Sequence, residues 1–230
     1  MALALAFLQA RMRSTRLPGK VLLTIQGRSI LARVVERLRA ARSLDGIVVL
    51  TTDLDEDQAI VAEAHRLGVE AYRGPDRDVL TRFRRAADVF RPDVIVRATA
   101  DNPLIDIGSI DRIIHTLRLK SLDYCMERDL PFGAATEAVT RLALERVDGL
   151  ARLPHHREHV TIYIKEHRDE FRAEFPFPPQ TLRRPDLRIT VDTPGDFAFV
   201  TSLIEAIPDD AGPIPLEQYL SRIRPASAPR

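Results

Sequence analysis

The sequence has little cysteine, few lysines and no long apolar segment. Cys125 is the only cysteine in 230 residues, which excludes an internal disulfide framework and is typical of a reducing cytoplasm. No apolar run approaches the ~20 residues that a transmembrane helix needs. The first run, at 3–8, is followed by arginines, whereas a secretory signal places its basic residues before the apolar stretch. We therefore expect a cytoplasmic protein.

A strong charge of one sign is also missing. The formal net charge is +1, which argues against a general nucleic-acid-binding protein, because such proteins usually carry a basic excess. Only three of the 34 basic residues are lysines, so arginine is common throughout the chain. A cluster of arginines is therefore informative only where its spacing or position adds something.

Two common phosphate-binding motifs are absent. The sequence contains neither G-x-x-x-x-G-K-[ST], the P-loop, nor G-x-G-x-x-G, the common dinucleotide-binding fingerprint. It contains instead a basic loop, QARMRSTRLPGK at 9–20. This loop carries four cations and two hydroxyl groups, at Arg11, Arg13, Arg16, Lys20, Ser14 and Thr15. Several cations on one loop match the charge of a triphosphate, and a solvated arginine-rich turn is the alternative interpretation.

Apolar runs alternate with amphipathic patterns over the first half of the chain. We expect strands at 3–8, 46–52, 69–74, 93–100 and 122–127, and helices at 29–42, 55–68, 77–90 and 107–120. This alternation predicts an α/β fold, with a mostly parallel sheet and helices on both faces. The second half is less regular. There we expect a helix at 154–171, extended segments at 171–180 and 186–192, and a helix at 193–207.

Ligands of parallel sheets bind at the carboxyl ends of the strands. The loops at 9–20, from Arg73 onward and at 99–106 are therefore expected at one edge. Asp101 and Asp192 each follow an expected strand, and carboxylates are ligands that Mg²⁺ prefers. The alternative for Asp192 is a cap of the helix that starts at Pro194, and the alternative for Asp101 is a cap of the turn in DNP.

The basic loop resembles the opening of nucleotidyltransferases that activate acidic sugars with CTP. These include the cytidylyltransferases for sialic acid and for 3-deoxy-manno-octulosonate, and the closer match is the SpsF type of spore-coat polysaccharide biosynthesis. The resemblance continues in order over roughly residues 3–200. It is carried by the segments QARMRSTRLPGKVL, TTDLDED, YRGPDRDVLTRF, VRATADNPLID, REHVTIYI and ITVDTPGDF.

The resemblance implies a three-layer, nucleotide-diphospho-sugar-transferase-like (Rossmann-like) fold. The expected domain covers 1–222, with a nucleotide half at about 1–125, an acceptor and dimer half at about 126–222, and a tail at 223–230. The implied activity is transfer of CMP from CTP to an acidic sugar or phosphorylated small molecule, with release of pyrophosphate, in surface polysaccharide biosynthesis. The implied partners are CTP, the acceptor and a second copy of the chain, without nucleic acid or membrane.

The resemblance also assigns site residues. The expected catalytic residues are Arg11, Lys20 and Asp101. Mg²⁺ is expected on Asp101 and Asp192. The expected nucleotide-binding residues are Leu8, Gln9, Ala10, Arg11, Ser14, Arg16, Lys20 and Arg73. The expected acceptor-binding residues are Gly133, Glu137, Arg157 and His159, although the segment around Gly133 and Glu137 also fits a turn followed by a helix start.

Three departures from the family pattern keep other functions open. Arg13 stands where the family usually has glycine, and Ala100 and Asn102 alter the turn around Asp101. A non-catalytic nucleotide-binding relative, or a nucleotidyl or glycosyl transferase that uses another nucleotide, would fit the same fold.

A zinc hydrolase is a minor alternative. HHREH at 155–159 contains H-x-x-E-H, and on a helix His155 and His159 would share one face, with Glu158 beside them. Cys125 has no activating partner in the sequence, so a buried position in a strand is favoured over a nucleophile.

Overall fold

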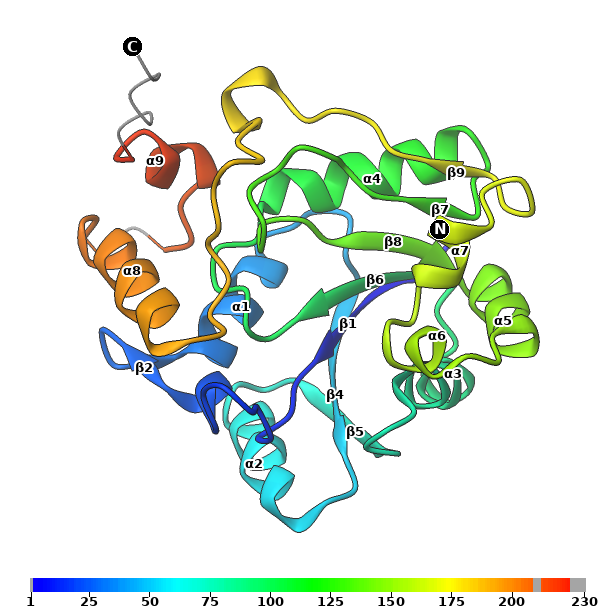
Figure 1. Cartoon of the computed structure of the whole chain (residues 1–230), viewed down its shortest axis with the longest axis horizontal. Coiled ribbons are helices and arrows are strands. Elements are labelled where there is room, and N and C mark those ends of the chain that lie inside the picture. The colour runs from blue at the N-terminus through cyan, green and yellow to red at the C-terminus, as the bar shows by residue number, and fades with distance from the viewer. Residues whose placement is uncertain (1, 209–211, 224–230) are drawn as a thin grey trace.

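The structure is a computed structural model that describes residues 2–208 and 212–223. Its centre is a seven-stranded sheet (Figure 1). In spatial order the strands are β5 (Glu70–Gly74), β4 (Gly46–Thr52), β1 (Ala4–Gln9), β6 (Val94–Thr99), β8 (Glu137–Thr140), β7 (Tyr124–Cys125) and β9 (Ala173–Glu174). Of the predicted tail at 223–230, only residue 223 is described.

The first four strands of the sheet are parallel, as the alternation of strands and helices predicts. β8 is antiparallel to both β6 and β7, and β9 is parallel to β7. The sequence does not predict β8, because four residues are too few to display a period. The structure thus corrects the turn and helix start considered around Gly133 and Glu137: a turn leads into β8, and a helix begins only at Arg141.

Side chains alternate between the two faces of the sheet and build two cores. Ala4, Ala6 and Leu8 of β1 face one core, whereas Leu5 and Phe7 face the other. The first core is covered by α1 (Ile30–Arg39), α2 (Gln58–Arg66) and α4 (Ile107–Leu119). The second core is covered by α3 (Val79–Phe90), α5 (Arg141–Leu150) and α7 (Ile162–Glu166). The prediction of a sheet with helices on both faces is confirmed.

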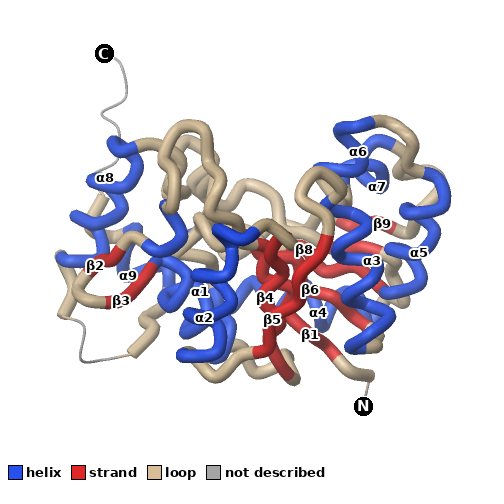
Figure 2. Tube along the Cα trace, turned by 90° about the horizontal axis from the view of Figure 1, so that it is seen from below, coloured by secondary structure: helices blue, strands red, loops and turns tan. Residues whose placement is uncertain are grey.

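A third apolar cluster lies beyond one end of the sheet (Figure 2). It joins α8 (Pro194–Glu205), α9 (Leu216–Leu220) and the hairpin of β2 (Thr24–Ile25) and β3 (Arg28–Ser29). Ile189 and Val191 pack into this cluster. The expected extended segment 186–192 begins in a turn at Asp186 and forms an isolated bridge between Phe132 and Arg188, rather than the strand that we expected before Asp192.

The prediction of one continuous helix at 154–171 is wrong. It is divided into α6 (Pro154–Glu158) and α7, and His159 to Thr161 form a break between them. Val160, a β-branched residue, has a φ of 20°, which an α-helix does not accommodate. Short 3-10 helices at Lys20–Leu22, Asp55–Asp57 and Gln180–Leu182 complete the described elements.

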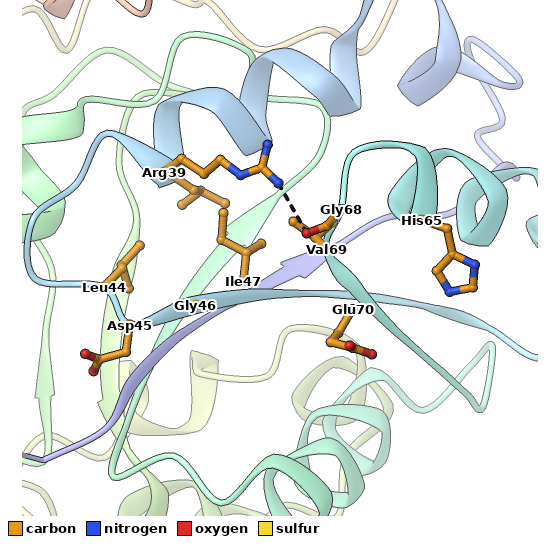
Figure 3. Close-up of a pocket in the computed structure, with 10 residues that line it drawn as sticks. Arg39, Leu44, Asp45, Gly46, Ile47, His65, Gly68, Val69 and Glu70 are labelled. Atoms are coloured by element: carbon orange, nitrogen blue, oxygen red, sulfur yellow. Dashed lines mark hydrogen bonds between the residues drawn. The ribbon is translucent and has the colours of Figure 1, made fainter.

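A cavity of about 720 Å³ opens at the amino ends of β4 and β5. Figure 3 shows the Arg39 guanidinium directed at Gly68 there, where it donates a 3.3 Å hydrogen bond to the carbonyl. Because ligands of parallel sheets bind at the opposite, carboxyl ends of the strands, this cavity lies at the wrong edge for the expected chemistry. Among the described residues, no helix is long and apolar enough to cross a membrane.

Candidate active site

The basic loop and the loop after β6 enclose a first cavity, of about 240 Å³. We call it the nucleotide cavity. Because β1 and β6 are neighbours, the ends of both strands open onto it, and Ala100 N donates to Gln9 O at 2.9 Å. The lining residues are Gln9, Ala10, Arg11, Arg13, Ser14, Thr15, Arg16, Lys20, Val21, Thr99, Ala100, Asp101 and Asp192. The structure therefore brings most of the residues expected to bind nucleotide and metal to one place.

Lys20 lies at the centre of this arrangement. Gly19 has a φ of 69° and donates its N–H to Met12 O at 2.9 Å, which turns the chain back on itself before Lys20. The Lys20 side chain is nearly buried, and its Nζ donates to Asp101 Oδ2 and to Asp192 Oδ1, both at 2.7 Å. One ammonium group thus bonds two carboxylates that are distant in sequence.

Asp192 is surrounded by cations. Besides Lys20, Arg188 donates to its carboxylate and Arg16 lies 3.1 Å away. Burial alone would raise the pKa of Asp192, but the hydrogen bond and charge of Lys20, with Arg188 and Arg16, hold this pKa below its ordinary value. Asp192 is therefore ionised at neutral pH and available as a ligand for a cation.

The structure does not show the capping roles considered for Asp101 and Asp192. Thr193 is the N-cap of α8, and Asp196 completes a capping box with it. The Asp101 side chain bonds to Lys20, and it is the main-chain carbonyl of Asp101 that accepts Val191 N at 2.8 Å. Both carboxylates are therefore free of the helix and turn and converge on a positive charge.

Asp57 is a residue near the site that the sequence analysis missed. It is buried, and it accepts hydrogen bonds from Met12 N at 2.7 Å, Thr51 Oγ1 at 2.9 Å, Thr52 N at 3.0 Å and the Thr52 hydroxyl. Burial would raise the pKa of Asp57, but these hydrogen bonds, led by that of the Thr52 side chain, lower it. The carboxylate fixes the start of the basic loop to the end of β4. Its only sequence signal is its place after that strand, in TTDLDED.

The departures from the family pattern leave the nucleotide cavity open. Arg13 is directed to Glu56, with Nε 2.6 Å from Oε1, and both side chains are exposed. Ala100 is buried, and Asn102 Nδ2 donates to Thr99 Oγ1 at 2.7 Å, which closes the turn around Asp101. Arg11 lies 3.8 Å from Glu158 at the rim.

A second cavity, of about 600 Å³, adjoins the first. We call it the acceptor cavity. The two cavities share Thr99, Asp101 and Asp192, so the carboxylate pair lies at their junction. Four charged or titratable side chains of the lining come from β6, β8, the α6–α7 break and α7, namely Arg97, Glu137, His159 and Lys165.

Glu137 organises one wall of the acceptor cavity. It is buried, with Lys165 Nζ 2.6 Å and Arg97 Nη1 3.4 Å from its oxygens, and it accepts a hydrogen bond from the Thr161 hydroxyl. Burial would raise the pKa of Glu137, but Arg97 and then Lys165 lower it. Arg97 and Lys165 were not predicted as site residues. The scarcity of lysine is the feature of the sequence that could have drawn attention to Lys165.

Gly133, which also lines the acceptor cavity, permits a close backbone approach. Its φ is 101°, and a Cβ added there would lie 2.7 Å from Thr190 N. This approach holds the 131–134 turn against the segment that carries Asp192, through the 2.9 Å bond from Ile189 N to Phe132 O. Glycine is therefore required by geometry as well as by any role in binding.

We expect Gly133→Ala to destabilise the protein by about 1–3 kcal/mol, from the positive φ and the contact with Thr190. The matched control is Gly149→Ala in α5, where nothing lies within 4 Å of the added Cβ. That change should leave stability within about 1 kcal/mol of wild type, since alanine favours a helix. Urea unfolding measures both variants, and equal stabilities would contradict the packing argument.

Three expected site residues line neither cavity. Leu8 is buried in the core under β1. Arg73 donates to Thr52 O at 3.1 Å and Leu54 O at 2.9 Å, and so braces the loop after β4. Arg157 binds Asp78 and Asp148 at 2.9 and 2.8 Å, so it joins α6 to α3 and α5. The side chains of Arg73 and Arg157 thus have partners inside the protein, and their expected binding roles stay predictions.

The motif for a zinc hydrolase is not assembled as predicted. α6 ends at Glu158, and His159 lines the acceptor cavity. Within 2–208 and 212–223, the group of three or more His, Cys, Asp or Glu side chains close enough to hold one metal ion contains His155 but neither Glu158 nor His159. Cys125 is a buried strand residue, and burial raises the pKa of its thiol to about 12, which confirms the interpretation as core.

Comparisons with known proteins agree with this arrangement. A sequence profile of the family described as Cytidylyltransferase matches residues 5–218. An uncharacterised protein of Methanocaldococcus jannaschii is 41% identical over 199 residues, which are 86% of this chain and 82% of that protein. The spore coat polysaccharide biosynthesis protein SpsF of Bacillus subtilis is 33% identical over 206 residues, 87% of this chain and 86% of that one.

The solved structure of a cytidylyltransferase from Leptospira borgpetersenii superposes with a TM-score of 0.90 at 30% identity. The match covers 96% of this chain and 93% of that structure. The order of motifs, the sheet and the site at its carboxyl edge thus lead to one family, and the chain belongs to the cytidylyltransferases.

Proposed function

We propose that this enzyme transfers CMP from CTP to an acidic sugar or a phosphorylated small molecule and releases pyrophosphate. The observation that carries the proposal is the place of Lys20, Asp101 and Asp192 at the junction of the two cavities. A reaction between two substrates needs them side by side at the charged centre, and this junction is common to both cavities.

The basic loop supplies the charge for the triphosphate. Arg11, Arg16 and Lys20 would hold the β- and γ-phosphates and stabilise the charge that develops on the departing pyrophosphate. Ser14 would donate a further hydrogen bond. The polar groups of Gln9 and Ala10 would contact the cytosine; Gln9 Oε1 is buried and has no partner among the described residues.

The carboxylate pair fits a divalent cation. Asp101 and Asp192 present hard oxygen donors that already converge on the Lys20 ammonium, and we propose that they hold Mg²⁺ together with phosphate oxygens. When bound, the ion would offset negative charge on the phosphates. Lys20 would then give up its bond to at least one carboxylate, and its ammonium would be available to the nucleotide.

The acceptor cavity offers cations that could hold an acidic molecule. Arg97, Arg128 and Lys165 line it together with His159, and Arg97 Nε has no hydrogen bond among the described residues. The lining also contains five carboxylates, those of Asp101, Glu127, Asp129, Glu137 and Asp192. Arg97 and Lys165 would hold an acceptor carboxylate or phosphate, while the attacking oxygen is directed to the α-phosphorus from the side opposite pyrophosphate. The likeness to SpsF suggests a role in surface polysaccharide biosynthesis.

By the same family likeness we propose a cytoplasmic homodimer. Sedimentation of the full chain tests the dimer, and a monomer at all concentrations would contradict it.

The test of the function measures two quantities. Thermal unfolding with Mg²⁺ and each of CTP, UTP, GTP and ATP reports binding, since a ligand at 100 times its Kd stabilises the folded state by about 2.7 kcal/mol. Pyrophosphate release with a panel of sugar acids then reports turnover. A stabilisation selective for CTP, with acceptor-dependent pyrophosphate, is expected. Binding without release across the panel, or preference for another nucleotide, would favour the non-catalytic relative or a different transferase.

A further inference from the structure

A second group of metal-type ligands lies outside both cavities, where α6 meets α7. It consists of His155, His156 and Glu166, and one ligand atom from each lies within 4.8 Å of the other two. His156 Nε2 is 2.7 Å from Glu166 Oε2, and His155 Nε2 is 3.4 Å from Glu166 Oε1. α6 and α7 lie side by side in both views of the fold (Figures 1 and 2).

The donor set identifies the kind of ion. Two imidazoles and one carboxylate suit Zn²⁺ and similar transition metals, whereas Mg²⁺ takes oxygen ligands and suits the aspartate pair of the active site. With metal–ligand bonds of about 2.0–2.2 Å, tetrahedral ligand atoms lie about 3.3–3.5 Å apart. Ligand atoms up to 4.8 Å apart therefore need to approach by little more than 1 Å, whereas His156 Nε2 and Glu166 Oε2, which are 2.7 Å apart, need to separate by about 0.6–0.8 Å to admit the ion. The fourth position is left to water.

The side chain of His156 is held in place by its neighbours, whereas those of His155 and Glu166 have room to move. His156 is buried, 4% exposed, and its ring packs edge-on against Tyr163 with ring centroids 5.1 Å apart. Tyr163 in turn stacks on His167, with centroids 4.0 Å apart. His156 Nδ1 is buried without a hydrogen-bond partner among the described residues, so the ring is held by packing and by the contact of Nε2 with Glu166. The side chains of His155 and Glu166 are about half exposed.

The position of the group connects it to the acceptor cavity. α6 and α7 have five residues each and are too short to be stable alone. The break between them carries His159 and Thr161, and Lys165 precedes Glu166 in α7. His159 and Lys165 line the acceptor cavity, and Thr161 and Lys165 both bond to Glu137. An ion on the outer side of the two helices would therefore stiffen one wall of that cavity.

We propose that His155, His156 and Glu166 form a site for Zn²⁺ or a chemically similar transition-metal ion that clamps α6 to α7. This site differs from the H-x-x-E-H motif, because its third ligand comes from α7 and the ion has a structural role. It is separate from the magnesium proposed at Asp101 and Asp192, and it does not depend on the nucleotide that the enzyme uses.

The binding test uses chelator-treated protein without a histidine tag. Calorimetric titration with Zn²⁺ should give one ion per chain in wild type. The same Zn²⁺ titration in the presence of excess Mg²⁺ should give the same result, because Mg²⁺ should not compete for this site. The double variant His155→Ala/Glu166→Gln changes only partly exposed side chains and should weaken Zn²⁺ binding by at least about 100-fold, as expected for loss of two of three ligands. His115→Ala, at an exposed histidine of α4, is the matched control and should bind as wild type does.

Two outcomes would overturn the site. One is the absence of Zn²⁺ binding in wild type below millimolar concentration. The other is unchanged stoichiometry and affinity in the double variant, which would place the ion elsewhere. Co²⁺ added in place of Zn²⁺ gives an independent readout, because its visible absorption reports imidazole ligation and should be lost in the double variant and in His156→Ala.

The clamp has its own measurement. Hydrogen exchange of the amides at 159–166, which form the break and α7, should slow when Zn²⁺ is added to wild type. The reason is that the ion joins α6 to α7. The same amides should be unaffected in the double variant, and amides of α4 should serve as an internal reference. Tight Zn²⁺ binding with unchanged exchange at 159–166 would overturn the clamp.

Discussion

Lys20→Ala is expected to slow pyrophosphate release from CTP by about 10³-fold, the upper range for loss of one preorganised charge at a reacting centre. The expectation rests on position. Lys20 is the nearly buried cation that bonds both Asp101 and Asp192 at 2.7 Å, at the junction of the two cavities. Without the ammonium, the phosphates meet two carboxylates that lack their shared positive charge, so binding of CTP should weaken as well.

The matched control is Lys120→Ala. Lys120 is the exposed lysine at the end of α4, where it pairs with Glu174 at 2.7 Å, and its loss should leave turnover unchanged. Folding of Lys20→Ala is checked by circular dichroism, and CTP binding by the thermal shift. Turnover within threefold of wild type in a folded Lys20→Ala protein would exclude Lys20 from catalysis.

Asp101→Asn and Asp192→Asn are each expected to reduce turnover by about 10²–10³-fold. Asparagine keeps the shape of the side chain but removes the negative charge, so the loss reports charge rather than packing. Both variants should also need much more Mg²⁺ for half-maximal activity. Titration of pyrophosphate release against Mg²⁺ concentration at saturating CTP measures this directly.

The control for this pair is Asp169→Asn, an exposed aspartate after α7 that lies outside both cavities. It should match wild type in rate and in Mg²⁺ requirement. Because Asp101 and Asp192 share Lys20, the double variant should lose less than the product of the single effects. An unchanged Mg²⁺ requirement in both single variants would place the metal at other ligands.

The roles of some residues were open to prediction and those of others were not. Lys20 was predictable, because a rare lysine follows Pro18-Gly19 at the end of a loop that leaves a parallel strand. Arg73 and Arg157 show the limit of the same reasoning, since a motif locates a side chain on an element without revealing its partner. Arg157 binds Asp78 across 79 residues of sequence, a contact that only folding creates.

Asp57 and Glu137 were harder to interpret for a different reason. Both are buried carboxylates whose charge is stabilised by neighbours from other elements. These are four donors at the end of β4 and in the basic loop for Asp57, and Arg97, Thr161 and Lys165 for Glu137. A charged carboxylate is stable in a protein interior only when it has such partners, and the sequence does not show which residues contact it in the fold.

By itself the sequence determined the parallel half of the sheet, the helices on both its faces, and the edge at which the candidate site lies. These follow from local periodicity and from the rule that strands β1 and β6 end on the same side. Only the tertiary structure decided that β8 runs antiparallel, that the 154–171 segment breaks at His159, and that Asp192 reaches Lys20 across 172 residues. Those features depend on long-range packing of the second core, of the third apolar cluster and of β8 against β6, and no short window of sequence contains both partners of such a contact.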